Sequence, residues 1–234
     1  METMDFLNRR NILKGAGLVG AGLCTGCTVE SAPEPQPTVK RRIDFDLPYF
    51  YNADGTFNSN RAKDAYITLM LYHGYPVPSD IREKLWVTDY GKHEFTRLGL
   101  GAYMVVNNRE HGFMMMELFM LPGQMVPEHY LLATNQNSVK MMGWFCRYGL
   151  LYVYGEGLPT AMMRAVVPMC HMNGTVATKH EVILEPGVYT QLVRPAAPHW
   201  QFAGPQGAIV TETSNYHDEE GIRFMDPSVR YPEN

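Results

Sequence analysis

The stretch GQMVPEHYLLATNQNSVKMMG, residues 123–143, contains a short pattern that occurs twice in this chain. In its first occurrence, a Pro-Gly pair ending at Gly123 is followed, after five further residues, by His129. A second Pro-Gly pair, ending at Gly187, precedes His199. Because Pro-Gly pairs are typical of turns, the pattern predicts two strands that each follow a turn and carry a histidine.

Short apolar segments surround both histidines. From Gly91 onward they are rich in aromatic and β-branched residues and are interrupted often by Gly or Pro, which predicts strands in a sandwich or barrel. The predicted strands are AYMVVN, FMMMELFML, GWFCRYGLLYVYG, EVILEPG, TQLVRP, HWQFAG and AIVTETS. Before them, residues 59–75 show apolar residues at helical spacing, with Ser59 as a cap and Gly74 as the end, and a second short helix is expected at residues 79–86. We therefore expect one mainly β domain with N-terminal helices.

The N-terminal segment NRRNILKGAGLVGAGLCTGC, residues 8–27, resembles a twin-arginine export signal. The alternative is an ordinary amphipathic helix. The segment ends in a pattern that resembles a lipobox, which predicts lipidation of Cys27. Residues 28–42 are rich in proline and predict an extended tether. We expect an export signal at 1–27, a tether, and a domain at 43–234, in a periplasmic protein or a membrane-anchored lipoprotein.

Composition limits the choice of partners. The formal net charge is −4, which argues against a nucleic-acid partner because phosphate binding needs a basic surface. Contact with a membrane is expected only through the N-terminal lipid. If the signal is removed, Cys146 and Cys170 remain beside the anchor, and they could pair in an oxidising compartment or stay free and buried.

The doubled Pro-Gly and histidine pattern resembles the two sequence motifs of the cupin superfamily. WVTDYGKHEF, NNREHG, LPGQMVPEH, GPQGAIVTE and YHDEEGIRFMDP further resemble cupin-type sugar isomerases related to D-lyxose isomerase, over most of residues 49–230. The resemblance implies a jelly-roll β-barrel that commonly forms homodimers. It also implies that a divalent metal, commonly manganese, assists the interconversion of aldoses and ketoses.

The metal ligands that the resemblance implies are only half present. His129 and His199 match the first and last histidine ligands, whereas Leu131 stands where a second histidine is usual. The carboxylate ligand of the family would fall at Asn135 or Gln136, or at Met142 if the loop is longer, and all three are neutral. The acid–base lysine of the family would fall at Thr134, which is also neutral.

Two neutral imidazoles without a carboxylate make a poor site for a hard cation. The sequence therefore predicts either a divalent metal (manganese, iron or zinc) held with the help of unusual ligands, or no metal. Lys140 stays open as a substitute for the missing lysine. Glu128 precedes His129 on a strand and is expected to point the other way, toward the rim or solvent.

Five further residues are candidates for chemistry or ligand contact. Glu117 and Glu212 lie in apolar strands, and as catalytic residues facing the cavity they would replace the missing charge; alternatively they face solvent. Arg194 could contact a sugar hydroxyl or lie in a surface turn. Trp144 and Trp200 could stack on a sugar, although core packing is the other interpretation of each.

Three functions follow from these observations. The first is an exported cupin with a degenerate metal site that binds a carbohydrate or related small molecule, with isomerase activity weak or lost. The second is a working metal-dependent aldose–ketose isomerase or epimerase with non-standard ligands. The third is a structural or partner-binding lipoprotein with a filled barrel.

Overall fold

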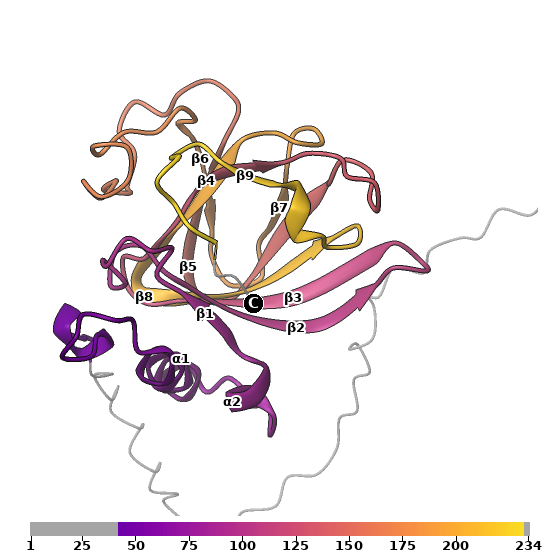
Figure 1. The fold of residues 1–234 in the computed structure, drawn as a ribbon. Helices are drawn as coiled ribbons and strands as arrows, with labels where there is room; N and C mark the ends of the chain where they lie inside the picture. Colours follow the sequence, from indigo (N-terminus) through magenta and orange to yellow (C-terminus); the bar gives the residue numbers. More distant parts are fainter. Residues whose placement is uncertain (1–41, 232–234) are drawn as a thin grey trace, which may run out of the picture. The chain divides into compact units, whose positions relative to one another are not determined.

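The computed structural model describes residues 42–231 (Figure 1). The predicted export signal with Cys27, and the tether up to residue 41, lie outside the described residues. Within the described range, none of the helices has the length and apolar character needed to cross a membrane.

Helices form before the first strand, as the sequence predicts. A 3-10 turn, η1, spans Leu47–Phe50, α1 spans Ser59–His73, and α2 spans Ile81–Lys84. Asn58, one residue earlier than expected, caps α1 by accepting a hydrogen bond from the Arg61 amide. Gly74 ends the helix in the left-handed conformation.

The rest of the described chain is an antiparallel sheet of nine strands. They are β1 Trp86–Thr88, β2 Leu100–Asn108, β3 Phe113–Met120, β4 Met125–Leu131, β5 Met142–Gly155, β6 His180–Leu184, β7 Tyr189–Gln191, β8 His199–Ser214 and β9 Ile222–Phe224, with a 3-10 turn, η2, at Glu219–Gly221. The predicted segments HWQFAG and AIVTETS are one continuous strand, β8. The three-residue strands β1 and β9 were not predicted.

Two long strands, β5 and β8, close the sheet on itself. The strand order is β1-β2-β3-β8-β4-β9, and β8 pairs with β3 through residues 208–214 and with β4 through residues 199–202. On its other edge β8 pairs with β5 along both halves, and β5 also pairs with β6 and β7. The sheet therefore curls around an interior (Figure 1). The expected mainly β fold, a jelly-roll barrel with N-terminal helices, is confirmed.

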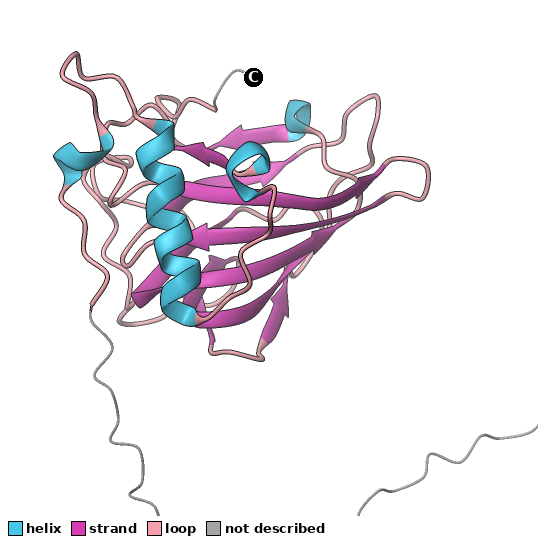
Figure 2. Cartoon of the chain, turned by 90° about the horizontal axis from the view of Figure 1, so that it is seen from below, coloured by secondary structure: helices cyan, strands magenta, loops and turns pink. Residues whose placement is uncertain are grey.

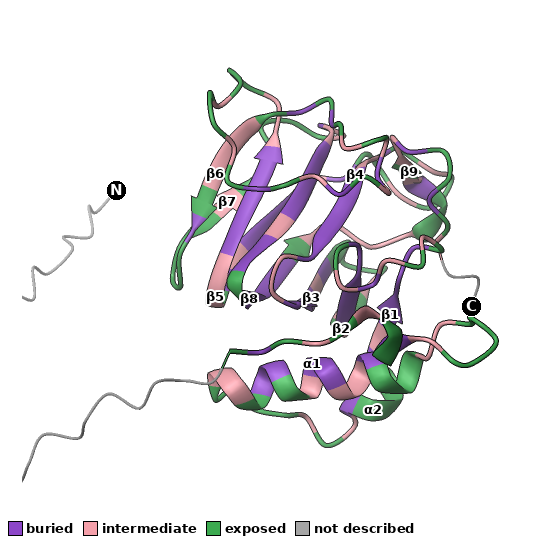
Figure 3. Ribbon diagram, turned by 90° about the vertical axis from the view of Figure 1, so that its left-hand side faces the viewer, coloured by how far each residue is buried: buried purple, intermediate pink, exposed green. Residues whose placement is uncertain are grey.

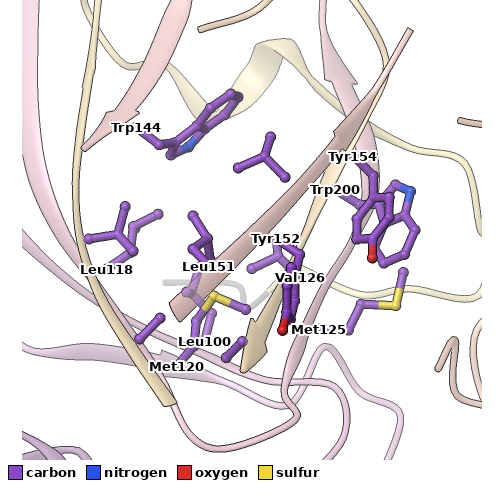
Figure 4. Close-up of a cluster of buried hydrophobic side chains, with 14 of the residues drawn as sticks. Leu100, Leu118, Met120, Met125, Val126, Trp144, Leu151, Tyr152, Tyr154 and Trp200 are labelled. Atoms are coloured by element: carbon purple, nitrogen blue, oxygen red, sulfur yellow. The ribbon is translucent and has the colours of Figure 1, made fainter. Parts of the chain in front are cut away.

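Apolar side chains fill two regions on opposite faces of this sheet. Helix α1 lies across β1, β2 and β3 (Figure 2) and buries Tyr66 and Leu69 against Phe119 of β3 and Ile209 of β8. The larger cluster lies inside the barrel, where the inner faces of β3, β4, β5 and β8 are mostly buried (Figure 3). Figure 4 shows part of that cluster, with Trp144 at one side and, at another, the stacked rings of Tyr154 and Trp200, through which the cluster extends beyond the cavity.

Close backbone approach at the bend of β5 and β8 gives a first prediction. Gly149 has φ of +77°, and a Cβ there would lie 2.1 Å from the carbonyl oxygen of Gly207. We expect Gly149→Ala to lower the free energy of unfolding by about 3 kcal/mol, measured by urea denaturation. Gly112→Ala is the matched control, because Gly112 has φ of +67° but no atom within 4 Å of such a Cβ. It should cost only about 1 kcal/mol; equal losses for the two variants would contradict the argument.

Candidate functional site

The barrel interior contains a cavity of about 260 Å³. Val126, His129 and Leu131 of β4 line it. Val126 and His129 are three positions apart, and a β-bulge between them brings these two residues to the same face of the strand. Gln201 and Glu212 line it from β8. The cavity is thus built around the stretch that also carries the first histidine motif.

His129 and His199 meet inside the barrel. They are direct cross-strand partners of β4 and β8, and their ring centroids are 4.2 Å apart. His129 lines the cavity, whereas His199 lines a smaller pocket of about 40 Å³ beside it. The two histidines that the cupin resemblance matches to ligands are therefore neighbours, although they line different pockets.

In both imidazoles, Nδ1 is hydrogen-bonded to a backbone carbonyl oxygen. His129 Nδ1 lies 2.8 Å from the Pro127 carbonyl oxygen, and His199 Nδ1 lies 2.9 Å from that of Ala197. Since a carbonyl only accepts, each Nδ1 donates, and each Nε2 is left with a lone pair. The buried His199 Nε2 has no hydrogen-bond partner. The pair therefore offers two neutral acceptors to a ligand.

Burial keeps these histidines uncharged. It lowers the pKa of His129 to about 4. It also lowers the pKa of His199 well below its usual value, and the neighbouring His129 adds to that effect. Both rings are consequently neutral acceptors at neutral pH.

Glu212 faces the cavity from β8. Its cross-strand neighbours are Met116 of β3 and Trp144 of β5, and the Trp144 Nε1 donates a hydrogen bond of 2.9 Å to Glu212 Oε2. Burial raises the pKa of Glu212, while Lys140 and the Trp144 hydrogen bond oppose that rise. Trp144 thus orients the carboxylate, and its fully buried ring also lies 5.0 Å from that of His199.

Lys140 supplies a buried positive charge next to the cavity. Its side chain is 2% exposed, and its Nζ donates to His217 Nδ1 over 2.8 Å. Burial lowers the pKa of Lys140 to about 8, opposed by Glu212 and Asp218. Burial also lowers the pKa of His217, which lines the cavity, to about 3, and Lys140 contributes to that shift.

The roles of Lys140 and His217 were not predicted. The sequence left Lys140 open as a substitute for the missing lysine. One signal was present: Lys140 is the sole Asp, Glu, Lys or Arg between Glu128 and Arg147. Such a charge within an apolar stretch is typical of a paired, buried group.

Three predicted site residues lie elsewhere. Glu117 is the cross-strand partner of Thr211 and not of Glu212, so it lies on the face of β3 away from the cavity. There the Thr211 hydroxyl donates a 2.7 Å hydrogen bond to Glu117 Oε1. Arg194 is exposed and forms an ion pair with Glu156 at the surface. Trp200 is fully buried and stacks on Tyr154, facing away from the cavity because strand alternation separates it from His199.

Glu128 is also not at the rim. It is fully buried, and it accepts hydrogen bonds from the Ala177 amide at 2.8 Å, the Thr178 amide at 2.7 Å and the Thr178 hydroxyl at 2.6 Å. It does point away from the cavity, as alternation predicts. Its role in the structure is to hold the segment that follows β5, residues 156–179, against the barrel.

The residues of this cavity do not fit a divalent metal. Leu131 and Met142, which stand at two positions considered for the missing ligands, both line it with apolar side chains. Among residues 42–231, no three His, Cys, Asp or Glu side chains converge as a metal-binding group. Hard cations need several oxygen ligands, and the buried ammonium of Lys140 would repel a cation.

The two cysteines of the described residues do not pair: Cys146 and Cys170 are both free thiols.

Acid should destabilise the protein because of these histidines. The pKa of His129 is lowered to about 4 in the folded state, against about 6.5 in an unfolded chain. The unfolded state therefore binds more protons below pH 6.5, and stability is lost as the pH falls from there toward 4. We expect a loss on the order of 2 kcal/mol over that range, measured by urea denaturation at each pH. His129→Gln should weaken this dependence without abolishing it, because the pKa values of His199 and His217 are lowered as well. The exposed His111→Gln should leave it unchanged.

Comparisons with known proteins give consistent results, although no family model matches the chain. It is 36% identical over 159 residues to the D-lyxose ketol-isomerase of Thermofilum sp. (strain ex4484_79), covering 67% of this chain and 86% of that relative. It is 35% identical over 154 residues to the D-lyxose/D-mannose isomerase of Thermosediminibacter oceani, covering 65% of this chain and 82% of that relative.

Solved structures agree at the level of the fold. The unliganded L-ribose isomerase of Cellulomonas parahominis has a TM-score of 0.52 at 13% identity, over 72% of this chain and 91% of that one. The L-ribose isomerase of Acinetobacter sp. DL28 has a TM-score of 0.52 at 12% identity, over 73% and 92%. The sequence relatives are close enough, and covered far enough, to assign the family: this chain belongs to the D-lyxose ketol-isomerase family of sugar isomerases.

Proposed function

We propose that this protein is an exported sugar-isomerase relative that binds a carbohydrate or a related hydroxyl-bearing small molecule in its barrel, with isomerase activity weak or lost. One observation carries the proposal. Two neutral histidines and Glu212 are gathered at one end of the interior, while Leu131 and Met142 stand where further ligands would be needed. The polar groups that could bind a sugar are present, and the donor set for a metal is not.

The arrangement suits hydrogen bonding to hydroxyl groups. The Nε2 atoms of His129 and His199 can accept from hydroxyls because each Nδ1 is already committed to a backbone carbonyl. Glu212 also accepts, and the Gln201 amide can both donate and accept. Isomerisation needs in addition a group that polarises the carbonyl and one that moves a proton between adjacent carbons. Two carboxylates line the cavity, Glu212 and Glu219, and Glu212 is the buried one.

The test is calorimetric titration of the full chain with D-lyxose and D-mannose, together with an isomerase assay in added Mn²⁺. We expect measurable binding by the unaltered chain. Binding by His129→Gln should be at least fivefold weaker, because an acceptor that lines the cavity is displaced. We expect no turnover. Efficient Mn²⁺-dependent turnover would overturn the proposal. Absence of binding by any sugar would overturn its carbohydrate part.

The orientation of Glu212 favours one alternative, a working isomerase with non-standard ligands. In that case Glu212 would join His129 and His199, and turnover would depend on all three. Glu212→Gln would then abolish an activity that the unaltered chain shows. The same assay therefore separates the two functions.

Export is proposed from sequence alone. The twin-arginine segment and the lipobox-like Cys27 support a periplasmic or membrane-anchored lipoprotein, with residues 28–42 as its tether. Replacing Arg9 and Arg10 by lysine should leave the protein in the cytoplasm, and Cys27→Ser should release it from the membrane fraction. The predicted homodimer likewise stays a prediction, which sedimentation equilibrium would check.

A further inference from the structure

The wall of the cavity is divided by strand. Three adjacent strands, β1, β2 and β3, contribute Trp86, Leu100, Ala102, Met104, Met116 and Leu118, and the indole N–H of Trp86 is the one strong hydrogen-bonding group among these side chains. The other polar side chains come from the rest of the lining: His129 of β4, Gln201 and Glu212 of β8, His217 and Glu219 after β8, Lys84 of α2, Tyr90 and Tyr231. The boundary falls between neighbouring strands, where Met116 of β3 is the direct partner of Glu212 of β8.

This division constrains the ligand. A free pentose or hexose carries a hydroxyl or carbonyl on every carbon, so it can offer the β1–β3 wall only the small C–H faces of its ring. A hydroxyl placed in an apolar environment without a hydrogen bond loses about 1–3 kcal/mol. A larger apolar group placed there gains more from leaving water, and the Trp86 N–H is the one strong polar group of the wall that it could cover.

The positive charge near the cavity does not alter this conclusion. Lys140 is not among the lining residues and is directed to His217, with Glu212 and Asp218 as its nearby opposite charges. Lys84, at the end of α2, lines the cavity but is paired with Asp80 over 2.7 Å. Neither ammonium is placed to satisfy hydroxyls along the β1–β3 wall.

We propose that the cavity binds an amphipathic sugar derivative, whose hydroxyl-bearing end contacts His129, Gln201 and Glu212 and whose apolar substituent lies against the wall formed by β1, β2 and β3. An alkyl or aryl glycoside has an apolar substituent large enough to cover this wall, whereas an unsubstituted sugar has only the C–H faces of its ring. The inference rests on the proposed carbohydrate-binding function and names its ligand class.

The experiment compares three probes by calorimetric titration of the full chain: D-mannose, phenyl α-D-mannoside and 4-phenylbutane-1,2-diol. Burial of a phenyl ring should make phenyl mannoside bind at least tenfold more tightly than D-mannose. Met104→Gln should reduce that ratio at least threefold, because Met104 is a partly exposed residue of the apolar wall whose replacement is nearly isosteric. Met162→Gln is the matched control, since Met162 is 85% exposed on the segment after β5.

The outcomes separate this inference from the function on which it rests. Equal or tighter binding of D-mannose, or a ratio unchanged by Met104→Gln, would overturn the inference and leave carbohydrate binding intact. Binding of the phenyl diol without either mannose probe would support the apolar wall and overturn the carbohydrate function. Binding of none of the three would overturn both.

Discussion

Combining Leu131→His with Met142→Glu is expected to raise the affinity for Mn²⁺ at least a hundredfold over that of the unaltered chain. Both residues already line the cavity that His129 lines, so the new side chains would enter the same space. Together with His199 they would give three imidazoles and a carboxylate, and each added ligand strengthens binding of a divalent cation. Calorimetric titration with Mn²⁺ measures the gain directly.

The control for this variant is Leu132→His with Met142→Glu. Leu132 is 42% exposed, so its replacement adds a histidine outside the cavity and should bring little gain. Adding Lys140→Met to the first pair should tighten Mn²⁺ binding further, because removal of a buried ammonium removes a repulsion. Lys179→Met, at an exposed lysine, should not. Stoichiometric, tight Mn²⁺ binding by the unaltered chain would contradict the degenerate site.

Replacing Glu128 by alanine is expected to lower the free energy of unfolding by about 4 kcal/mol. The fully buried carboxylate accepts three hydrogen bonds from Ala177 and Thr178, between 2.6 and 2.8 Å. Hydrogen bonds to a charged group contribute about 1.5 kcal/mol or more each, and the donors left behind would be buried without partners. Urea denaturation measures the loss.

The same network gives a local readout. Thr178 also accepts a 2.9 Å hydrogen bond from Trp200 Nε1 through its carbonyl oxygen, so residues 156–179 are held at more than one point. Hydrogen exchange of this segment should accelerate in Glu128→Ala, and the exposed Glu185→Ala should change neither measurement. A stability within about 1 kcal/mol of the original, with unchanged exchange, would contradict the role assigned to Glu128.

Local patterns predicted the elements better than their arrangement. The helix at residues 59–73 follows from its apolar spacing and from Gly74, and most strands follow from aromatic and β-branched residues between Gly and Pro. The three-residue strands β1 and β9 have too little sequence to show a period, and they form because β2 and β4 offer edges with which to pair. HWQFAG and AIVTETS merge because β5 pairs with both along the whole of β8.

The two glutamates in the apolar strands show why the site was only partly predicted. Glu117 and Glu212 occupy similar sequence contexts, yet β3 and β8 pair so that Met116 is opposite Glu212 and Glu117 is opposite Thr211. A shift of β3 by one residue would place Glu117 directly opposite Glu212, with both carboxylates on one face. Strand register depends on contacts between distant segments, so the sequence of either strand alone leaves the choice open.

From the sequence alone came the mainly β class and the N-terminal helices, since these depend on residue types and short spacings. The resemblance to cupins added His129, His199 and Leu131 as positions of one expected site. Tertiary structure alone decided that Glu212 faces inward and Glu117 outward, that Trp200 and Glu128 hold the outer segment, and that Lys140 reaches His217. The physical reason is that burial and cross-strand register are properties of the whole barrel. A side chain acquires its partners and its pKa only when strands far apart in the chain are brought together.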